Sequence, residues 1–288
     1  MKRKHQPEAS RFPPKPSPMS TSQNGSSPLF IPEKESPVFT RIFYRYALTL
    51  YRRRFRAVWL DDRQMPRNRL ATLYIGNHNS WWDALNPLLL NERVIGQRAR
   101  AMMDEEQLLQ YPFFRWLGVF SINRQHPRKA LASLEHAVQL LNESGDAQRP
   151  VGLWFYPEGK LMRPDKPIVA ENGITWLARK LDPARTEIVP FATHIHSMRG
   201  DKPELFVRMG PAINPRMFEM TGEPARDQAQ TRRIAGIMEQ LRESVRRDSA
   251  DFGDSGGSGD SGSGPGKSGP VGNKQTVDGF RLLLGRPY

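Results

Sequence analysis

The sequence predicts an α/β fold, a layered domain in which helices flank a largely parallel or mixed sheet. Two observations support this prediction. Short apolar runs recur along the chain, and each ends in Gly, Pro or polar residues, as buried strands do. Segments with helical periodicity lie between these runs, and such alternation is typical of a layered domain with parallel strands. A chain of 288 residues holds one sizeable domain of this kind plus tails.

The predicted strands are short and apolar, and the predicted helices carry apolar residues at helical spacing. Strands are predicted at 71–75, 118–122, 151–155, 188–192 and 205–209, with a short strand or loop at 94–100. Helices are predicted within 36–60, from 104 to the proline at 112, and at 129–142, 172–181 and 226–247.

Composition divides the chain into four parts. Residues 1–35 are rich in Pro, Ser and Lys and predict a disordered tail. Residues 36–248 form the domain, and 249–270 form a flexible Gly/Ser linker. The last segment, 271–288, either docks back on the domain or touches a membrane, and the sequence leaves both open.

The residue counts exclude several kinds of site. No cysteine occurs, which excludes disulfides, thiolate nucleophiles and cysteine-ligated metals and fits a reducing compartment. The net charge of +13 favours an acidic partner such as nucleic acid, an anionic membrane surface or a phosphorylated small molecule. No run approaches the roughly 20 apolar residues of a membrane span, and no signal peptide is visible. We therefore expect a cytoplasmic protein without a transmembrane helix.

The segment 36–60 predicts a basic amphipathic helix. Apolar residues recur along it, and four arginines gather toward its end, at Arg52, Arg53, Arg54 and Arg56. Helices of this kind bind membrane surfaces. A helix packed on the domain core with a solvated basic end has the same periodicity, so both interpretations stay open.

The strongest candidate for chemistry lies where the strand at 71–75 ends. His78 and Asp83 follow this strand within a turn and a helix start. A histidine takes up a proton near neutral pH, and a carboxylate on one ring nitrogen fixes its tautomer, so the pair is a candidate general base and its orienting partner. In the alternative, Asp83 completes a capping box with Ser80, and His78 is an ordinary turn residue. The two roles of Asp83 compete for the same carboxylate oxygens.

Charged residues follow two further strands. Arg124 has a planar guanidinium that suits phosphate, although a single arginine is by default a surface residue. Glu158 accepts hydrogen bonds or holds Lys160 or Arg163, and Gly159 permits a positive φ or a close backbone approach. The alternative is a polar loop held by a salt bridge.

Two other groups of side chains are candidates for a site. His194 and His196 share a strand face, but no third ligand is evident, so we expect no metal site. Large apolar side chains in the region 101–124 either pack in the core or line a slot for a fatty acyl chain. These are Met102, Met103, Leu108, Leu109, Phe113, Phe114, Trp116 and Leu117.

Three blocks, in order, resemble the glycerolipid acyltransferase family, which includes the lysophosphatidic acid acyltransferases. They are the His-x4-Asp of 77–83 (NHNSWWD), the Gly-x5-Arg of 118–124 (GVFSINR) and the Tyr-Pro-Glu-Gly of 156–159. The segment 188–192 is similar to a weaker fourth block, and the resemblance covers roughly residues 72–212. The family usually continues Pro-Glu-Gly with Thr-Arg-Ser, whereas this chain has Lys160-Leu161-Met162, which leaves the acceptor's identity open.

The resemblance implies a glycerol-3-phosphate acyltransferase-like fold and an O-acyltransferase of phospholipid biosynthesis on the membrane periphery. It implies an acyl-CoA or acyl carrier protein donor, no cofactor, and a lysophospholipid acceptor such as 1-acylglycerol-3-phosphate, or another lipid or glycolipid alcohol. It assigns catalysis to His78 and Asp83, and acceptor binding to Arg124, Glu158, Gly159, Lys160 and Arg163. Because the chain lacks cysteine and a Gly-x-Ser-x-Gly elbow, we expect direct attack by the acceptor and no acyl-enzyme.

Three rival classes of protein fit part of the sequence. The charge alone fits a nucleic-acid-binding protein, but neither zinc-finger spacing nor an aromatic-basic ribonucleoprotein signature occurs, so we expect no nucleic-acid partner. The others are an inactive membrane-binding relative and an esterase that uses the same histidine.

Overall fold

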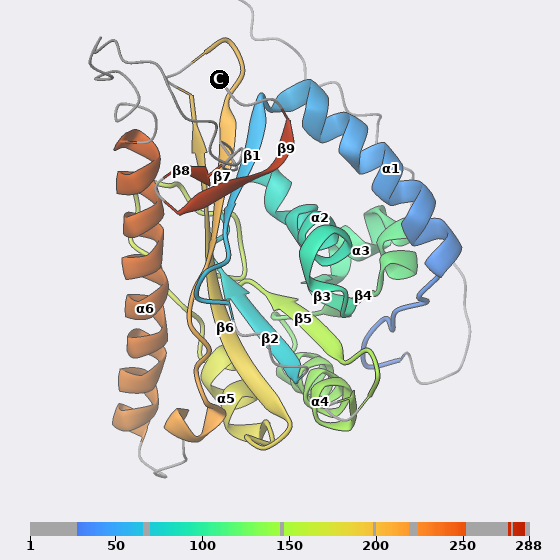
Figure 1. Ribbon diagram of the computed structural model, residues 1–288. Helices are drawn as coiled ribbons and strands as arrows, with labels where there is room; N and C mark the ends of the chain where they lie inside the picture. The colour runs from blue at the N-terminus through green and yellow to red at the C-terminus, as the bar shows by residue number, and fades with distance from the viewer. Residues whose placement is uncertain are drawn as a thin grey trace, which may run out of the picture.

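The computed structural model describes residues 28–65, 70–144, 147–197, 200–218, 224–251, 276–277 and 279–285. In these residues one sheet of nine strands is covered by helices on both faces (Figure 1). The predicted α/β fold class is therefore confirmed. The predicted tail over residues 1–27 and the linker over 252–270 lie outside the described residues.

The sheet has the strand order β4-β3-β5-β2-β6-β7-β1-β9-β8. The strands are β1 (Ala57–Asp61), β2 (Ala71–Gly76), β3 (Arg98–Asp104), β4 (Val119–Ile122), β5 (Val151–Phe155), β6 (Thr186–His196), β7 (Glu204–Met209), β8 (Thr276–Val277) and β9 (Phe280–Gly285). The five strands from β4 to β6 pair in parallel, and β7 is antiparallel to β6. The carboxyl ends of β2, β4 and β5 therefore lie at the same edge of the sheet, and each carries one block of predicted site residues.

Helices cover the two faces of the sheet in separate groups. The α-helices are α1 (Pro37–Arg54), α2 (Asn86–Leu90), α3 (Glu105–Gln110), α4 (Pro127–Ser144), α5 (Gly173–Lys180) and α6 (Pro224–Asp251). Leu73 and Ile75 of β2 share a core with α4, α5 and α6, whereas Tyr74 packs in a second core with α1 and α2. Successive side chains of a strand point to opposite faces, so this alternation defines a three-layer domain with a central strand buried on both sides.

The segment predicted as one helix divides into a helix and a strand. Ser36 caps α1 by accepting a hydrogen bond from the Phe39 N–H, and the helix ends at Arg54. Residues Ala57–Asp61 are all buried and form β1 between β7 and β9, so the helix predicted within residues 36–60 occupies only the first part of that segment. Tertiary pairing of a buried apolar run outweighed its local helical pattern. Among the described residues, no helix combines the length and apolar character needed to cross a membrane.

The N-terminal boundary of the domain lies earlier than predicted. Residues 28–35, assigned above to the tail, lie against the edge of the sheet. The Ile31 N–H donates to Ser121 Oγ at 2.7 Å, and the Ser121 N–H donates back to the Ile31 carbonyl at 2.9 Å. The carboxylate of Glu35 pairs with the buried Arg100. This segment therefore covers the otherwise open edge of β4.

The C-terminal segment docks on the domain, which was one of the two alternatives left open. β9 pairs antiparallel with β1, from Ala57 opposite Gly285 to Leu60 opposite Arg281. Helix α6 continues to Asp251, three residues beyond the predicted domain boundary.

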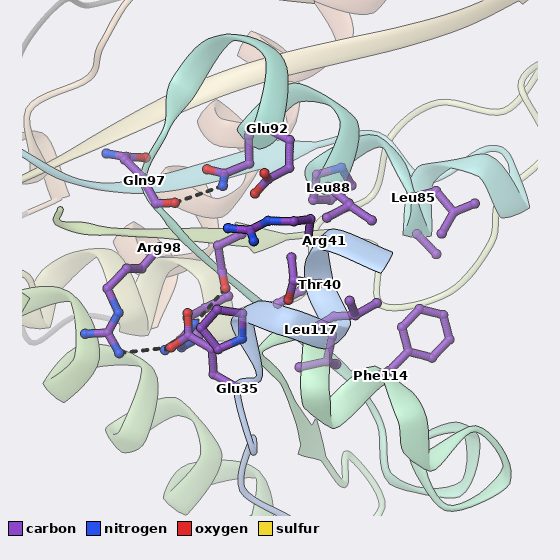
Figure 2. Close-up of a pocket in the computed structure, with 18 of the residues that line it drawn as sticks. Glu35, Thr40, Arg41, Leu85, Leu88, Glu92, Gln97, Arg98, Phe114 and Leu117 are labelled. Carbon is purple, nitrogen blue, oxygen red and sulfur yellow. Dashed lines mark hydrogen bonds and ion pairs between the residues drawn. The ribbon is translucent and has the colours of Figure 1, made fainter. Parts of the chain in front are cut away.

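A cavity of about 180 Å³ lies between the start of α1, α2 and β3 (Figure 2). Its wall mixes apolar side chains with charges, including Leu85, Leu88, Phe114, Leu117, Glu35, Arg41, Glu92 and Arg98. Of the apolar residues predicted to pack or to line a slot, Phe114 and Leu117 reach this cavity, Leu108 is buried in the core, and Leu109 and Trp116 are exposed.

Candidate functional site

The site begins at the end of β2, where a tight approach to β6 requires a glycine. A Cβ on Gly76 would lie 2.2 Å from the ring of Phe191, so no larger residue fits without moving that ring. After Gly76 the chain leaves the sheet, and residues Trp81–Ala84 form a single 3-10 turn. The predicted strand, turn and helix start are therefore present, with a 3-10 turn preceding α2.

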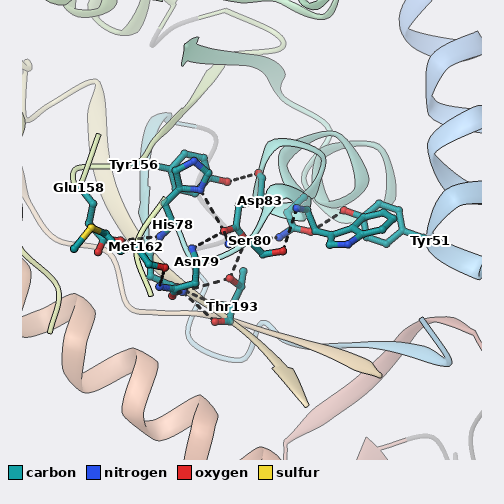
Figure 3. A network of polar contacts seen from close by, with 12 residues as sticks. Tyr51, His78, Asn79, Ser80, Asp83, Tyr156, Glu158, Met162 and Thr193 are labelled. Carbon is teal, nitrogen blue, oxygen red and sulfur yellow. Dashed lines mark hydrogen bonds and ion pairs between the residues drawn. The ribbon is translucent and has the colours of Figure 1, made fainter. Parts of the chain in front are cut away.

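His78 and Asp83 meet across this turn (Figure 3). The Nδ1 atom of His78 lies 3.3 Å from Oδ2 of Asp83. The histidine side chain is 21% exposed, whereas the aspartate side chain is 1% exposed. One ring nitrogen thus faces a buried carboxylate, which leaves Nε2 for a substrate.

The carboxylate of Asp83 both caps the turn and orients His78. Its Oδ2 accepts the backbone N–H groups of Asn79 at 2.9 Å and Ser80 at 2.8 Å, as in a capping box, in addition to contacting His78. The two roles therefore share one carboxylate oxygen, as the sequence predicts, but they do not exclude each other. A carboxylate has about four acceptor positions, and the bend places three donors around one oxygen.

The other oxygen of Asp83 is held by one side chain three residues along the chain and by one from β6. Oδ1 accepts from Asn86 Nδ2 at 3.2 Å and from Thr193 Oγ1 at 3.1 Å. Tyr51 of α1 donates its hydroxyl to Asn86 Oδ1 at 2.7 Å, which continues the network to the helix above the sheet. With both oxygens bonded in this way, the orientation of the carboxylate is fixed.

Tyr156 supports the histidine from β5. Its ring stacks on the imidazole of His78 with centroids 4.5 Å apart and an interplanar angle of 23°. Its hydroxyl donates to the backbone carbonyl of Asp83. Sequence reasoning assigned no role to Tyr156, Thr193, Asn86 or Tyr51; only the place of Tyr156 directly before Pro-Glu-Gly signalled one.

Glu158 anchors the backbone of the turn that carries His78 and Asp83. It is 2% exposed, and its Oε2 accepts the His78 N–H at 2.8 Å. Its Oε1 has no hydrogen-bond partner among the described residues. Burial raises the pKa of Glu158 above its ordinary value, although the hydrogen bond from His78 and the charge of Arg242 oppose this shift.

The raised pKa of Glu158 can be tested by measuring thermal stability as a function of pH. A carboxyl whose pKa is higher in the folded state stabilises the protein fully below its unfolded value, near 4.5, and this contribution is lost as the pH rises through the folded pKa. Glu158→Gln cannot ionise, so its thermal midpoint is expected to rise relative to wild type between pH 4 and pH 8. Thermal unfolding across that range measures the difference, and a constant difference contradicts a raised pKa.

Arg124 lies over the glycine of the third block. Gly159 has φ +64°, and a Cβ there would lie 2.4 Å from Nη1 of Arg124. The absence of a side chain therefore lets the guanidinium approach the backbone beside Glu158. The side chain of Arg124 is exposed and makes no hydrogen bond or ion pair with any residue that the structure describes.

The two remaining predicted cations differ from each other. Lys160 is exposed and, within the described chain, has no ionic partner. Arg163 is also exposed, but its Nε pairs with Asp165 Oδ1 at 3.0 Å. The structure thus brings His78, Asp83, Glu158, Gly159 and Arg124 together, and it places Arg163 in a surface ion pair.

The two histidines that share a predicted strand face, His194 and His196, both lie on β6. Burial lowers the pKa of His194 to about 4, with further contributions from His196 and Arg246. In the described part of the chain, no group of three or more metal-ligating side chains occurs.

The fold and this site define an α/β protein in which a partly exposed histidine contacts a buried aspartate. Residues 61–194 match a family model described as Acyltransferase, so this stretch is similar to the acyltransferase family. All seven predicted site residues lie within it.

Two further comparisons were made with curated proteins and with solved structures. No curated protein matches the chain. Among solved structures, the chain is similar to the 1-acyl-sn-glycerophosphate (LPA) acyltransferase PlsC from Thermotoga maritima, with 17% identity and a TM-score of 0.44. That match covers 74% of this chain and 78% of the other.

Proposed function

We propose that this protein transfers a fatty acyl group from acyl-CoA or acyl carrier protein to the hydroxyl of a lysophospholipid such as 1-acylglycerol-3-phosphate. The observation that carries the proposal is the contact between the partly exposed His78 and the buried Asp83 within the stretch that matches the acyltransferase family model. An imidazole with one nitrogen fixed by a carboxylate and the other free is suited to act as a general base.

The reaction follows from this geometry. Nε2 of His78 takes the proton of the acceptor hydroxyl as its oxygen attacks the carbonyl carbon of the thioester. Asp83 stabilises the imidazolium that forms. The carbon–sulfur bond then breaks, the ester remains on the acceptor, and the thiolate leaves with the proton returned from His78. The chain has no cysteine, and no acyl-enzyme is needed.

The acceptor's phosphate is assigned to the cationic edge of the site. Arg124 is free of protein partners among the described residues and lies over Gly159, so its planar fork is available for a phosphate. Lys160 adds an exposed charge from the same turn. Arg163 contributes less in this proposal, because Asp165 already neutralises it. A lipid or glycolipid alcohol is the second candidate acceptor, since the turn departs from Thr-Arg-Ser.

The test is a thiol-release assay with acyl-CoA against a panel of lysophospholipids and lipid alcohols. Thiol release that requires 1-acylglycerol-3-phosphate, with formation of the diacyl product, supports the proposal. Thiol release with free fatty acid and no need for an acceptor indicates an esterase. Tight, salt-dependent DNA binding with no turnover indicates a nucleic-acid-binding protein.

We also propose that α1 attaches the protein to an anionic membrane surface, where such an acceptor resides. One face of α1 packs on the domain through Ala47 and Tyr51. The opposite side exposes Val38, Ile42 and Tyr46, which are spaced four residues apart and so form one stripe. Five arginines and no acidic residue occur in the helix. The structure thus supports both interpretations of the segment 36–60, one on each face of the helix.

Neutralising the basic end of α1 is expected to weaken vesicle binding. Changing Arg52, Arg53 and Arg54 to Gln removes about 1 kcal/mol per charge near an anionic surface, or roughly a hundredfold in partitioning. Sedimentation with vesicles of phosphatidylserine and phosphatidylcholine at low salt measures this. Arg56 is left unchanged, because it follows the end of the helix.

A matched control removes three charges from the other side of the sheet. Arg232, Arg233 and Arg247 are exposed on α6, which lies across the sheet from α1 (Figure 1). If their change to Gln lowers vesicle binding as much as the α1 change does, net charge rather than α1 drives attachment.

A further inference from the structure

The loop between β5 and α5, residues 156–172, carries the third block. It is hydrogen-bonded to the turn 77–84, which carries His78 and Asp83 and which we call the catalytic turn. The Met162 N–H donates to the His78 carbonyl at 2.7 Å, and Asn79 Nδ2 donates to the Met162 carbonyl at 3.0 Å. Figure 3 shows Met162 beside His78 and Asn79. This contact fixes the middle of the loop but leaves the return toward α5 to be held elsewhere.

Two side chains of α6 hold the same loop at a second place. Nη1 of Arg242 donates to the Lys166 carbonyl at 2.8 Å, and Oε2 of Glu239 accepts the Ile168 N–H at 2.9 Å. The two side chains also pair with each other, Arg242 Nη2 with Glu239 Oε1. The side chain of Ile168 is buried in the core that α6 shares with α4 and α5. The loop is therefore clamped at two backbone positions by one ion pair.

The guanidinium of Arg242 is buried and hydrogen-bonds the backbone of the loop, so its role goes beyond packing. Arg242 is 6% exposed, and its Nε, like Oε1 of Glu158, finds no hydrogen-bond partner among the described residues. Burying a charge costs free energy unless it is paired and hydrogen-bonded. The charge of Arg242 partly offsets the effect of burial on the pKa of Glu158, so the two groups interact electrostatically.

We propose that Arg242 and Glu239 are positioning residues that hold the acceptor-binding turn, Glu158 to Lys160, in its binding geometry. Both lie on α6, outside residues 61–194 that match the acyltransferase family. Through Lys166 and Ile168 they fix the far side of the loop whose near side contacts the catalytic turn. The inference rests on the proposed function, because it assigns the clamp to acceptor binding.

The test compares Arg242→Gln and Arg242→Lys with a matched control, Arg246→Gln. Arg246 lies one turn along the same helix, is exposed and, among the described residues, pairs with Glu243, whose other oxygen lies 3.9 Å from Arg242 Nη2. Arg246 makes no hydrogen bond or ion pair with any described residue of the loop, so the control makes the same chemical change without removing a hydrogen bond to the loop. Two measurements are made on the full chain. Steady-state kinetics give KM for acceptor and donor separately, and amide hydrogen exchange reports opening at Met162 and Ile168.

Arg242→Gln is expected to raise KM for the acceptor on the order of tenfold, the usual effect of losing a hydrogen bond to a charged group, with donor KM changed far less. Amide exchange at Ile168 is expected to quicken by a similar factor. Arg242→Lys keeps the charge near Glu158 and is expected to recover part of the loss. Arg246→Gln is expected to match wild type in both measurements.

Equal acceptor KM and equal exchange in the Arg242 and Arg246 variants would overturn the proposal. A rise in acceptor and donor KM together would overturn it too, since that indicates general loosening. If Arg242→Gln does not fold, Arg242→Lys carries the same comparison. If the wild-type protein acylates no acceptor, the proposed function fails, whereas the exchange measurement still decides whether the clamp exists.

Discussion

Replacing His78 by alanine is expected to lower the rate of acyl transfer by about a hundredfold to ten-thousandfold, the usual contribution of a general base. The acceptor hydroxyl then keeps its proton as it attacks, and neither of the two carboxylates that contact the His78 turn replaces the lost nitrogen. Asp83 faces inward with both oxygens occupied, and Glu158 is buried against the backbone. The thiol-release assay at saturating donor and acceptor measures this loss.

His136→Ala is the matched control for this variant. His136 is also 21% exposed and contacts a carboxylate, that of Glu33 at 3.0 Å, but it lies on α4. Its replacement is expected to leave the rate of acyl transfer close to that of wild type. Near-normal transfer by His78→Ala would remove the assignment of His78 as the base.

Replacing Asp83 by asparagine is expected to reduce both activity and stability. The amide nitrogen cannot accept a hydrogen bond, so at least two of the five donors around the carboxylate lose their acceptor. Each buried donor left unpaired costs about 1–3 kcal/mol, and the sum lowers the free energy of unfolding by roughly 3 kcal/mol. The loss of rate is expected to approach that of His78→Ala, because the imidazole loses its fixed tautomer.

Two measurements separate the roles of the pair. Urea unfolding is expected to show a lower midpoint for Asp83→Asn and little change for His78→Ala, whose side chain is partly exposed and contacts few polar groups. The double variant is expected to lose little more rate than either single variant, since the two residues act as a unit. A stable Asp83→Asn protein with normal turnover would contradict both roles.

The central strands could be predicted from the sequence because β2, β5 and the first part of β6 are buried on both faces and appear as continuous apolar runs. β1 could not, since its apolar residues continue directly from the amphipathic helix before them. Its identity depends on pairing with β7 and β9, which lie far away in the sequence. The docking of residues 28–35 depends in the same way on distant partners, notably Arg100.

The site residues that sequence reasoning found share one property: each follows a strand in a block with its own spacing. His78, Glu158 and Arg124 meet because β2, β5 and β4 end at one edge of the sheet. Thr193 was missed because it lies inside the long strand β6. Its role depends on its side chain being on the face of the sheet that meets Asp83, which the sequence pattern does not reveal. Arg242 was missed because a charged helix offers many arginines and no signal for the buried one.

The antiparallel pairing of β1 with β9 has a consequence for synthesis of the chain. Ala57 emerges from the ribosome early, yet its partner Gly285 is made 228 residues later. Until then one row of backbone donors and acceptors on β1 stays open, and such an open row is prone to pair with other chains. Contacts between positions so distant in sequence form slowly. Translation speed and chaperone supply thus bear on the yield of folded protein, even though the catalytic turn is complete long before.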